Sequence, residues 1–581
     1  MLKKTLVFLL VALVCGVHAG ESVNKDLSQY RELPLRELKT VQTLNAADFG
    51  ATPDDGKDDW QAFRKALNAL AEQAESAKLV VAPGRYLLNP PDAKPGERYF
   101  CLILDNCTNA VVDFQGSEII VQNPSRGFFR VDNSENVIVQ NATVEYDPVP
   151  HTEGIIRAFD PQSSTIDLKI RDGFPAPDLE YFQKAPARWG CQMDPDIPGR
   201  LKTGSQNHCF YSEVRRLKEG LFRVGLKNAN SAFWESVEIG DRFCLLARNY
   251  GSFFQVRQSR QVTALNLTSY NTPAGHYVSV MTEAFNVIGC KSPIKPGFWK
   301  GGNADAVHCQ SNRIGPWIED CLFEGISDDS LVIYARPFSV VEQLAPTRLK
   351  ISRLSDKNNA MPLYKGEVVV GDVLDFLNPE TGVVLASATV TSYDKAAQVI
   401  ELDHAVSGLS PGIDKRKTQI WNRAMGSGFV MKNNVLKNSR RYGVYLKASN
   451  GLIEGNHFEG LSSCAITLHN EPHAPNGPFC HNVTIRNNVI TECGFEGGFL
   501  QYPDIGALRV TARRLDYRDA ETGTAHGNLL IENNRFSNLK QRPISLSNVD
   551  GVVVRGNTLN ALPLGDGDVL VKSSKNTEVE K

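Results

Sequence analysis

Three features common in other functional classes are missing from this sequence. The 581 residues carry a formal net charge of −2, so no excess of either sign favours binding to nucleic acid or to an anionic membrane. No cysteine pair has the CxxC spacing that is typical of a structural zinc site. After the first 19 residues, no apolar run is long enough to span a bilayer. The hydrophobic content of 42%, with 46 glycines and 30 prolines, indicates a folded soluble protein with many turns.

The first 19 residues are typical of a secretory signal peptide. Lys3 and Lys4 form a basic start, Thr5 to Val14 an apolar centre, and Val17-His18-Ala19 a small-residue cleavage site. A membrane anchor is the competing interpretation, but the apolar run is short for one. We therefore expect cleavage after Ala19 and a secreted or periplasmic protein with no membrane attachment afterwards.

Eleven cysteines remain after Cys15, an odd number scattered along the chain. Free cysteine often behaves as a small buried hydrophobe, so most of them are expected in the core. One or two disulfides are also expected, and Cys101–Cys107 is the favoured local pair.

A short phrase of alternating apolar and polar residues, interrupted by asparagine or glycine, recurs along the chain. The alternation predicts short strands, and the asparagine or glycine tolerates the left-handed backbone of a bend. Asn434 and Asn456 are 22 residues apart, and Asn534 and Asn557 are 23 apart. This period predicts an all-β right-handed parallel β-helix, in which stacked coils bury a shared core. A leucine-rich repeat is disfavoured because its leucine and asparagine spacing is missing. The phrases lie at 137–146, 429–438, 452–461, 483–492, 529–538 and 552–561, and 318–325 fits the same frame with Cys321 in the asparagine position.

An amphipathic helix is expected near the N-terminus, where Trp60, Phe63, Leu67 and Leu70 share one face. Such a helix would cap the open end of the stack. The acids before it favour turn formation and helix N-terminal charge over a calcium site. These acids are Asp54, Asp55, Asp58 and Asp59.

Two segments lack the asparagine phrase and show alternating strands around Gly-Asp turns, which predicts two inserted small antiparallel β-barrels. They flank the coils that carry a group of acids, so they could wall a cleft. The expected organisation is a signal peptide (1–19), an N-terminal part of the β-helix with its capping helix (20–147), a first barrel (148–250), the acidic coils (251–339), a second barrel (340–422) and a C-terminal part of the β-helix (423–581).

Asp305, Asp328 and Asp329 are the candidate catalytic residues. Asp305 and Asp328 are 23 residues apart, about one coil, so they should stack roughly 4.8 Å apart on one face. Crowded carboxylates raise the pKa of at least one member. Glycoside hydrolysis needs one protonated carboxyl and one carboxylate that activates water or attacks the sugar. The three aspartates can supply both, and their spacing leaves the roles open.

The D…DD pattern across coils, the FGATPDDGKDD cap and the asparagine turns resemble the polygalacturonase-like β-helix superfamily. Within it, DAVHCQSNRIGPWIEDCLFEGISDD is similar to the core motif of glycoside hydrolase family 110, the exo-acting α-1,3-galactosidases. The resemblance implies a β-helix interrupted by small barrels, and metal-independent, inverting hydrolysis of terminal α-linked galactose by Asp305, Asp328 and Asp329. Neither a metal nor another cofactor is expected.

The sequence departs from these relatives after the Asp-Asp pair. The family has a strand ending in Asn-x-His there, whereas this chain has Tyr334 and Arg336. The Gly-His-Gly and Arg-Ile-Lys motifs of polygalacturonases are absent, which argues against a galacturonate substrate.

Six residues are candidates for substrate binding. His308 follows Asp305 by three positions, so in a strand the two would point to opposite faces unless the chain bends. Trp299, like Tyr277, is a candidate for stacking on a sugar, with packing of an insert against the β-helix as the alternative. The set is His308, Tyr334, Arg336, Glu471, Arg441 and Trp299, with Arg440 and Tyr442 beside Arg441 as weaker candidates.

These patterns favour a secreted exo-glycosidase whose partner is a galactose-terminated glycan or polysaccharide. A calcium-dependent polysaccharide lyase is one alternative, with the three aspartates holding the cation and Arg336 as base. A non-catalytic carbohydrate-binding β-helix is another, because the fold by itself does not decide function. An oligomer is compatible with the sequence.

Overall fold

The computed structural model describes residues 27–92, 99–354, 359–502 and 504–580. The expected signal peptide lies outside these ranges. None of the helices in the described ranges combines the length and the apolar character that crossing a membrane requires.

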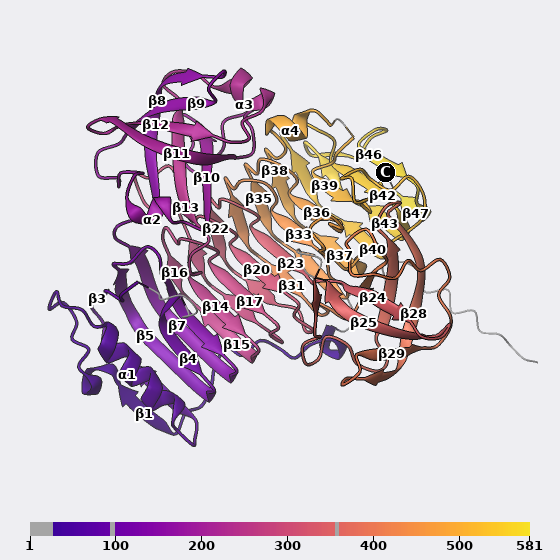
Figure 1. Ribbon diagram of the computed structural model, residues 1–581, viewed down its shortest axis with the longest axis horizontal. Helices are drawn as coiled ribbons and strands as arrows, with labels where there is room; N and C mark the ends of the chain where they lie inside the picture. The colour runs from indigo at the N-terminus through magenta and orange to yellow at the C-terminus, as the bar shows by residue number, and fades with distance from the viewer. Residues whose placement is uncertain (1–26, 93–98, 355–358, 503, 581) are drawn as a thin grey trace, which may run out of the picture.

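The body of the molecule is a stack of coils whose strands pair in parallel with those of the next coil (Figure 1). One sheet has 23 strands and follows the asparagine phrases, and a second has 11 strands. The predicted parallel β-helix is confirmed. The 11-stranded sheet consists, in order, of β4 (Phe100–Asp105), β6 (Gly127–Asp132), β14 (Phe254–Arg257), β17 (Tyr277–Val280), β20 (Val307–Gln310), β23 (Leu331–Tyr334), β33 (Val444–Leu446), β36 (Ile466–Leu468), β39 (Leu508–Val510), β42 (Ile544–Ser547) and β46 (Val569–Lys572).

Inward-pointing side chains of successive coils form one continuous hydrophobic core. Phe129, Phe254 and Phe285 stack along the axis with ring centroids 5.8 and 6.2 Å apart. The eleven cysteines of the described residues are all free and buried, so the expected Cys101–Cys107 disulfide is wrong. Both thiols pack in this core as small hydrophobes, and burial raises the pKa of Cys107 to about 11.

The asparagine phrases form a ladder of buried amides inside the turns. Asn434, Asn456, Asn488, Asn534 and Asn557 occupy equivalent positions on successive coils. The side chain of each of the first four donates to the next; for example, the Asn434 Nδ2 donates to the Asn456 Oδ1 over 2.9 Å. The residue before each of them has a positive φ, as Asn433 and Gly455 do (54° and 67°). The repeat therefore encodes a left-handed bend followed by an inward amide.

The capping helix α1 (Trp60–Ala71) closes the N-terminal end and buries Phe63, Leu67 and Leu70 against the first coils. The acids before it accept backbone hydrogen bonds, as expected for turn residues. Asp58 Oδ1 accepts from the Trp60 N–H over 3.0 Å, and Asp59 Oδ1 accepts from the Thr52 N–H over 3.0 Å. Three shorter helices lie elsewhere: α2 (Glu180–Gln183), α3 (Ser231–Ser236) and α4 (Gly497–Leu500).

Both inserts are antiparallel rings of strands that project from the β-helix (Figure 1). In the second insert, pairing of β24 with β25 joins the two ends of the row, so six strands close a ring and β26 lies outside it. The predicted pair of inserted barrels is confirmed. The first barrel comprises β8 (His151–Asp160), β9 (Thr165–Ile170), β10 (Ala187–Met193), β11 (Cys209–Lys218), β12 (Leu221–Leu226) and β13 (Arg242–Arg248). The second comprises β24 (Phe338–Gln343), β25 (Arg348–Leu354), β26 (Ala360–Met361), β27 (Val373–Asn378), β28 (Val383–Asp394), β29 (Val399–Leu402) and β30 (Gln419–Asn422).

The buried amide ladder makes Asn456 a sensitive position. We expect Asn456→Ala to lower the free energy of unfolding by about 2–4 kcal/mol, because it removes the acceptor of the Asn434 backbone N–H and side-chain amide and the donor to the Met431 carbonyl. Thermal unfolding followed by circular dichroism measures the change. Asn68→Ala on the exposed face of α1 is the control and should leave the melting temperature nearly unchanged. Equal effects of the two substitutions would contradict a structural role for the ladder.

Candidate active site

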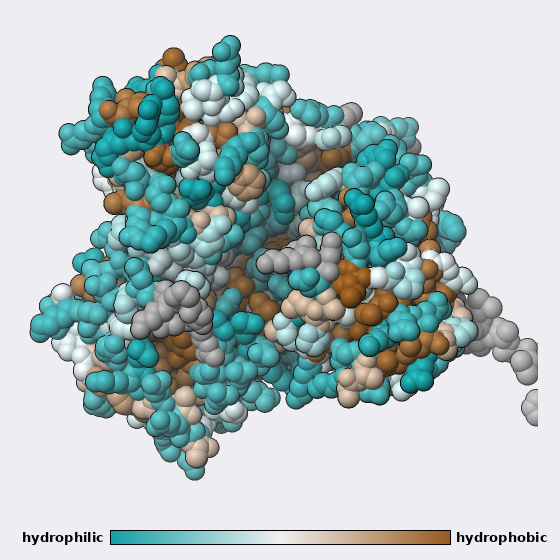
Figure 2. Space-filling model, viewed as in Figure 1, coloured by the Kyte–Doolittle hydropathy of each residue, from teal (hydrophilic) through white to brown (hydrophobic). Residues whose placement is uncertain are grey.

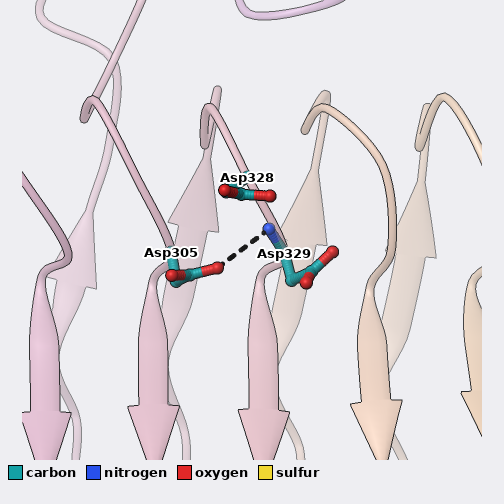
Figure 3. Close-up of side chains that lie close together, drawn as sticks. All are labelled: Asp305, Asp328 and Asp329. Atoms are coloured by element: carbon teal, nitrogen blue, oxygen red, sulfur yellow. Dashed lines mark hydrogen bonds between the residues drawn. The ribbon is translucent and has the colours of Figure 1, made fainter. Parts of the chain in front are cut away.

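The three aspartates lie in the turns that lead into neighbouring strands of the 11-stranded sheet. Val307 in β20 pairs with Leu331 in β23, which places Asp305 level with Asp329, two residues before each strand. The coil therefore advances by 24 residues at this point, and the expected 23-residue match of Asp305 with Asp328 is wrong by one position. The Asp329 N–H donates to Asp305 Oδ1 over 3.2 Å, which fixes the two side by side (Figure 3).

Three carboxylate oxygens, one from each aspartate, lie within 4.8 Å of one another. A divalent cation needs oxygen ligands at this kind of spacing. Asp328 and Asp329, however, already accept hydrogen bonds from arginines, so a cation would have to compete with guanidinium groups for two of its three carboxylates. The charges of this group are balanced by the protein itself.

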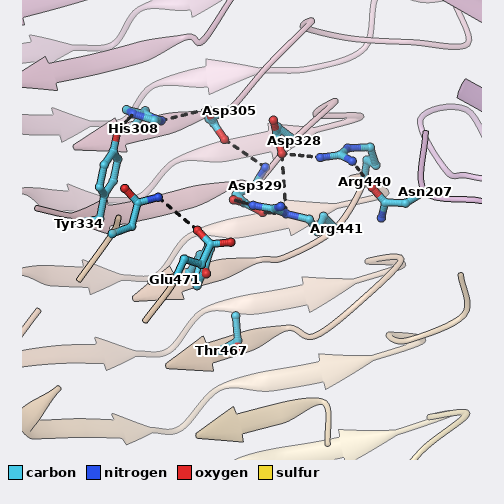
Figure 4. Close-up of polar contacts among 12 residues, drawn as sticks. Asn207, Asp305, His308, Asp328, Asp329, Tyr334, Arg440, Arg441, Thr467 and Glu471 are labelled. Atoms are coloured by element: carbon cyan, nitrogen blue, oxygen red, sulfur yellow. Dashed lines mark hydrogen bonds and ion pairs between the residues drawn. The ribbon is translucent and has the colours of Figure 1, made fainter. Parts of the chain in front are cut away.

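Asp328 is held between two arginines from different parts of the fold. Arg248, at the end of β13 in the first barrel, donates to Oδ2. Arg440, in the turn before β33, donates to Oδ1 (Figure 4). Burial by itself would raise the pKa of Asp328, but the charges of Arg440, Arg248 and the nearby Arg441 outweigh it and hold this pKa well below its usual range. Asp328 is therefore an ionised carboxylate at any physiological pH.

The first barrel supplies a wall of this site. The Trp189 ring lies 3.5 Å from the Arg248 guanidinium carbon and 4.6 Å from that of Arg440, and it stacks on His208 at 4.1 Å. Arg440 donates to the Asn207 side chain and contacts His208 Nδ1 at 2.9 Å. Burial and the arginines lower the pKa of His208 to about 3, so its ring is neutral and Nδ1 can accept.

Asp329 forms a two-point ion pair with one arginine, Arg441. The Arg441 Nε donates to Oδ1 over 2.7 Å, and a terminal nitrogen donates to Oδ2. Burial raises the pKa of Asp329, and although Arg441 opposes this, the charges of Asp328 and Asp305 add to it, so the pKa lies above its ordinary value. Arg441 has a φ of +75°, a conformation that costs a non-glycine residue energy and is concentrated at functional sites.

Asp305 has no arginine partner among the described residues, and it begins a chain of polar side chains instead. His308 Nδ1 lies 3.0 Å from Asp305 Oδ2, and its Nε2 lies 3.1 Å from the Tyr334 hydroxyl. That hydroxyl in turn donates to Gln310 Oε1 over 3.0 Å. His308 and Asp305 meet because Asp305 precedes the strand, where the chain bends, and strict alternation does not apply.

A further ion pair, between Glu471 and Lys447, borders the site on the C-terminal side. Glu471 lies 3.7 Å from the ammonium group of Lys447, a residue with a 1% exposed side chain that follows β33. Burial lowers the pKa of Lys447 to about 8. Although burial opposes it, Lys447 and Arg441 lower the pKa of Glu471 to about 2. Arg336 donates to the Ala474 carbonyl over 3.0 Å, so it supports the loop that carries Glu471.

Two aromatic candidates lie elsewhere. Tyr277 is fully buried in the core of the β-helix and cannot stack on a sugar, so that prediction is wrong. Trp299 packs against the first barrel, with Arg171 and Arg242 guanidinium carbons 4.2 and 4.8 Å from its ring. It joins that barrel to the coils, the alternative that the sequence left open. Its contacts do not bring it to the aspartates.

The site combines three carboxyl groups in three electrostatic settings: Asp328 locked as an anion, Asp329 buried with a raised pKa, and Asp305 hydrogen-bonded to histidine. Such a division of roles is typical of acid–base catalysis. Strands β20, β23 and β33 lie at the centre of the molecule (Figure 1), and the space-filling view shows a hollow there between the first barrel and the C-terminal half (Figure 2).

Comparison with known proteins agrees with the fold and with the resemblance. A family model described as "Right handed beta helix region" matches residues 415–511. Over 527 residues the chain is 24% identical to alpha-1,3-galactosidase B of Akkermansia muciniphila, covering 85% of this chain and 63% of that protein. Over 546 residues it is 21% identical to alpha-1,3-galactosidase A of Shewanella woodyi, covering 89% and 85%. The resemblance to glycoside hydrolase family 110 is confirmed at this level of similarity.

Among solved structures, an exopolygalacturonase from Thermotoga maritima matches with a TM-score of 0.42 and 12% identity, covering 96% of each chain.

The arginine pair around Asp328 generates a prediction about stability. Asp328→Asn leaves Arg248 and Arg440 without their anion, so we expect a loss of about 3–5 kcal/mol in the free energy of unfolding. Asp305→Asn is the matched control, because Asp305 has no arginine partner among the described residues. The amide oxygen of the new side chain can still accept from the Asp329 N–H. We therefore expect this substitution to lower the free energy of unfolding by less than about 1 kcal/mol. Thermal unfolding of both variants distinguishes them, and equal losses would contradict the arrangement.

Proposed function

We propose that this chain is a glycoside hydrolase that removes terminal α-linked galactose, with α-1,3 as the preferred linkage. The curated relatives are named alpha-1,3-galactosidases, and they align with 85–91% of the chain. The observation that carries the proposal is the group of three aspartates on adjacent coils. We also propose that the enzyme acts on chain ends and is exported, as the family resemblance and the N-terminal signal imply.

In this proposal Asp329 is the general acid and Asp305 the general base. The pKa of Asp329 is raised by burial and by the charges of Asp328 and Asp305, which is the direction that a general acid requires. Asp305 is not neutralised by an arginine of the described chain and contacts His308 at 3.0 Å, so it can accept a proton from water as the reaction proceeds. Asp328 positions the others: its negative charge holds Arg248 and Arg440 in place and helps to raise the pKa of Asp329.

The stereochemical course is proposed to be inversion, following the family resemblance. Inversion requires room for a water molecule between the base and the anomeric carbon, and most inverting enzymes separate their carboxyl groups by about 6.5–9.5 Å. The closest oxygens of the three aspartates come within 4.8 Å, which is short for that class. The first-formed anomer is therefore the decisive observation.

The function is tested by incubating the protein with galactose-α-1,3-galactose. We expect release of free galactose, with β-galactose as the first anomer by proton NMR, and a drop of about 10²–10⁴-fold in kcat for Asp305→Asn. Activity should survive a metal chelator. Loss of activity in chelator together with an ultraviolet-absorbing unsaturated product would favour the lyase alternative. Binding of the sugar without any turnover would favour the non-catalytic one.

The acid is identified by varying the leaving group. Asp329→Asn should lose most of its activity on the disaccharide, but retain far more on an aryl α-galactoside whose phenolate leaves without protonation. Asp305→Asn should be impaired on both substrates, because activation of water is needed in each case. An equal loss on both substrates for Asp329→Asn would overturn its assignment as the acid. The ratio of kcat/KM values for the two substrates is the measurement.

A further inference from the structure

A second cavity opens on the same face of the 11-stranded sheet, further towards the C-terminus. Its volume is about 440 Å³. Strands β39 and β42 form its floor, through Arg509 and Ser545. Its walls include Arg513, Tyr517, Asp519 and Lys572. No step of the proposed reaction uses any of these residues.

The cavity is a near neighbour of the aspartates. Val332 on β23, the strand after Asp329, pairs with Tyr445 on β33. Tyr445 pairs with Thr467 on β36, which pairs with Arg509 on β39, so the two regions are three strand spacings, about 14 Å, apart. Thr467 lies in the row beyond Glu471 in the close-up of the site (Figure 4). A ligand that follows the sheet from the aspartates therefore reaches this cavity next.

One short loop forms a wall shared by both sites. His469 packs on Tyr445 with ring centroids 4.5 Å apart, and Glu471 pairs with Lys447, so these two residues contact the coil that follows the aspartates. Asn470 exchanges hydrogen bonds with the Arg513 backbone over 2.7 and 3.1 Å, and His473 lies 3.8 Å from the Tyr517 ring. The loop 469–473 thus connects side chains that border the candidate active site with the lining of the second cavity.

The lining has the chemistry of a site for neutral sugar. The Tyr517 ring is 61% exposed and is supported from below by His473, so it offers a fixed aromatic face to the C–H face of a pyranose. Arg509 donates to both oxygens of Asp519 over 2.6 and 2.8 Å, and Arg513 lies 3.8 Å from the same carboxylate. Lys572 is paired with Asp504 over 2.7 Å. Arg509 and Lys572 are each hydrogen-bonded to a carboxylate, whereas the buried Nε of Arg513 makes no hydrogen bond with the described residues. The walls therefore present oriented donors and acceptors for hydroxyl groups, and two of the three cations are already engaged by carboxylates of the chain.

We propose that this cavity is a subsite for a neutral sugar on the leaving-group side of the scissile bond, two or more units away from the terminal galactose. This inference rests on the proposed function, because the terminal galactose must sit at the aspartates. It makes the protein selective for oligosaccharides over disaccharides, with Tyr517 as a binding residue that takes no part in the chemistry.

The test compares two substrates that share a terminal galactose-α-1,3-galactose: the disaccharide itself and a neutral pentasaccharide that ends in it. Tyr517→Ala should lower kcat/KM on the pentasaccharide by up to about tenfold and leave the disaccharide within about twofold. Tyr517→Phe keeps the ring and should retain wild-type preference. Tyr99→Ala, another exposed tyrosine distant in the fold, is the control and should change neither value. Equal losses on both substrates for Tyr517→Ala, or no preference in the wild type, would overturn the subsite.

A binding arm separates this inference from the proposed function. The probe is the neutral tetrasaccharide that the pentasaccharide leaves after loss of its terminal galactose, titrated into the wild type and Tyr517→Ala by calorimetry. Binding that weakens in Tyr517→Ala supports the subsite even if neither substrate is cleaved, which would reject only the hydrolase proposal. Undetectable or unchanged binding together with normal cleavage of the disaccharide would reject only the subsite.

Discussion

Register between successive coils is the constraint on which this molecule depends. Parallel pairing places equivalent residues of neighbouring coils one strand spacing apart, and the buried asparagine ladder and the stacked phenylalanines hold that register along the axis. The same register puts Asp305 level with Asp329, and Asp329 level with Tyr442 on the following coil. The carboxyl groups are brought together by the stacking that builds the core. A shift of one coil by a single residue would separate them and also expose inward side chains.

Charge compensation is the second condition, and it comes from both the coils and the insert. Arg440 and Arg441 occupy the turn one coil beyond the aspartates, whereas Arg248 comes from the first barrel. Without these cations the three crowded carboxylates would repel one another, and the folded state would be destabilised. Their uneven distribution, two arginines on Asp328 and one on Asp329, helps to shift the pKa values of these two aspartates in opposite directions. The inserted barrel is thereby part of the site as well as a wall beside it.

The site and the cavity beyond it share the loop 469–473, whose residues alternate between the two. A loop is the place where a solenoid can vary without disturbing its ladder, since the pairing strands remain unchanged. We therefore expect loops at one end of the 11-stranded sheet to determine which lengths of substrate the protein prefers. The proposed catalytic residues lie in the turns at the centre of the sheet.

The sequence by itself determined the β-helix, its capping helix, the two inserts and the three aspartates, because each is written in local periodicity or in a motif of adjacent coils. It led to Arg441 and Glu471 through their places at the ends of strands. The one-residue error in register, and the disulfide assigned to Cys101 and Cys107, arose because coil length and side-chain direction vary around a fixed strand pattern. Only the tertiary structure brought in Arg248, Trp189 and Lys447, which lie far from the motif in the chain and have no periodicity that marks them. The pKa values of Asp328 and Asp329 depend on charges distant in the sequence and on burial, and both exist only once the chain has folded.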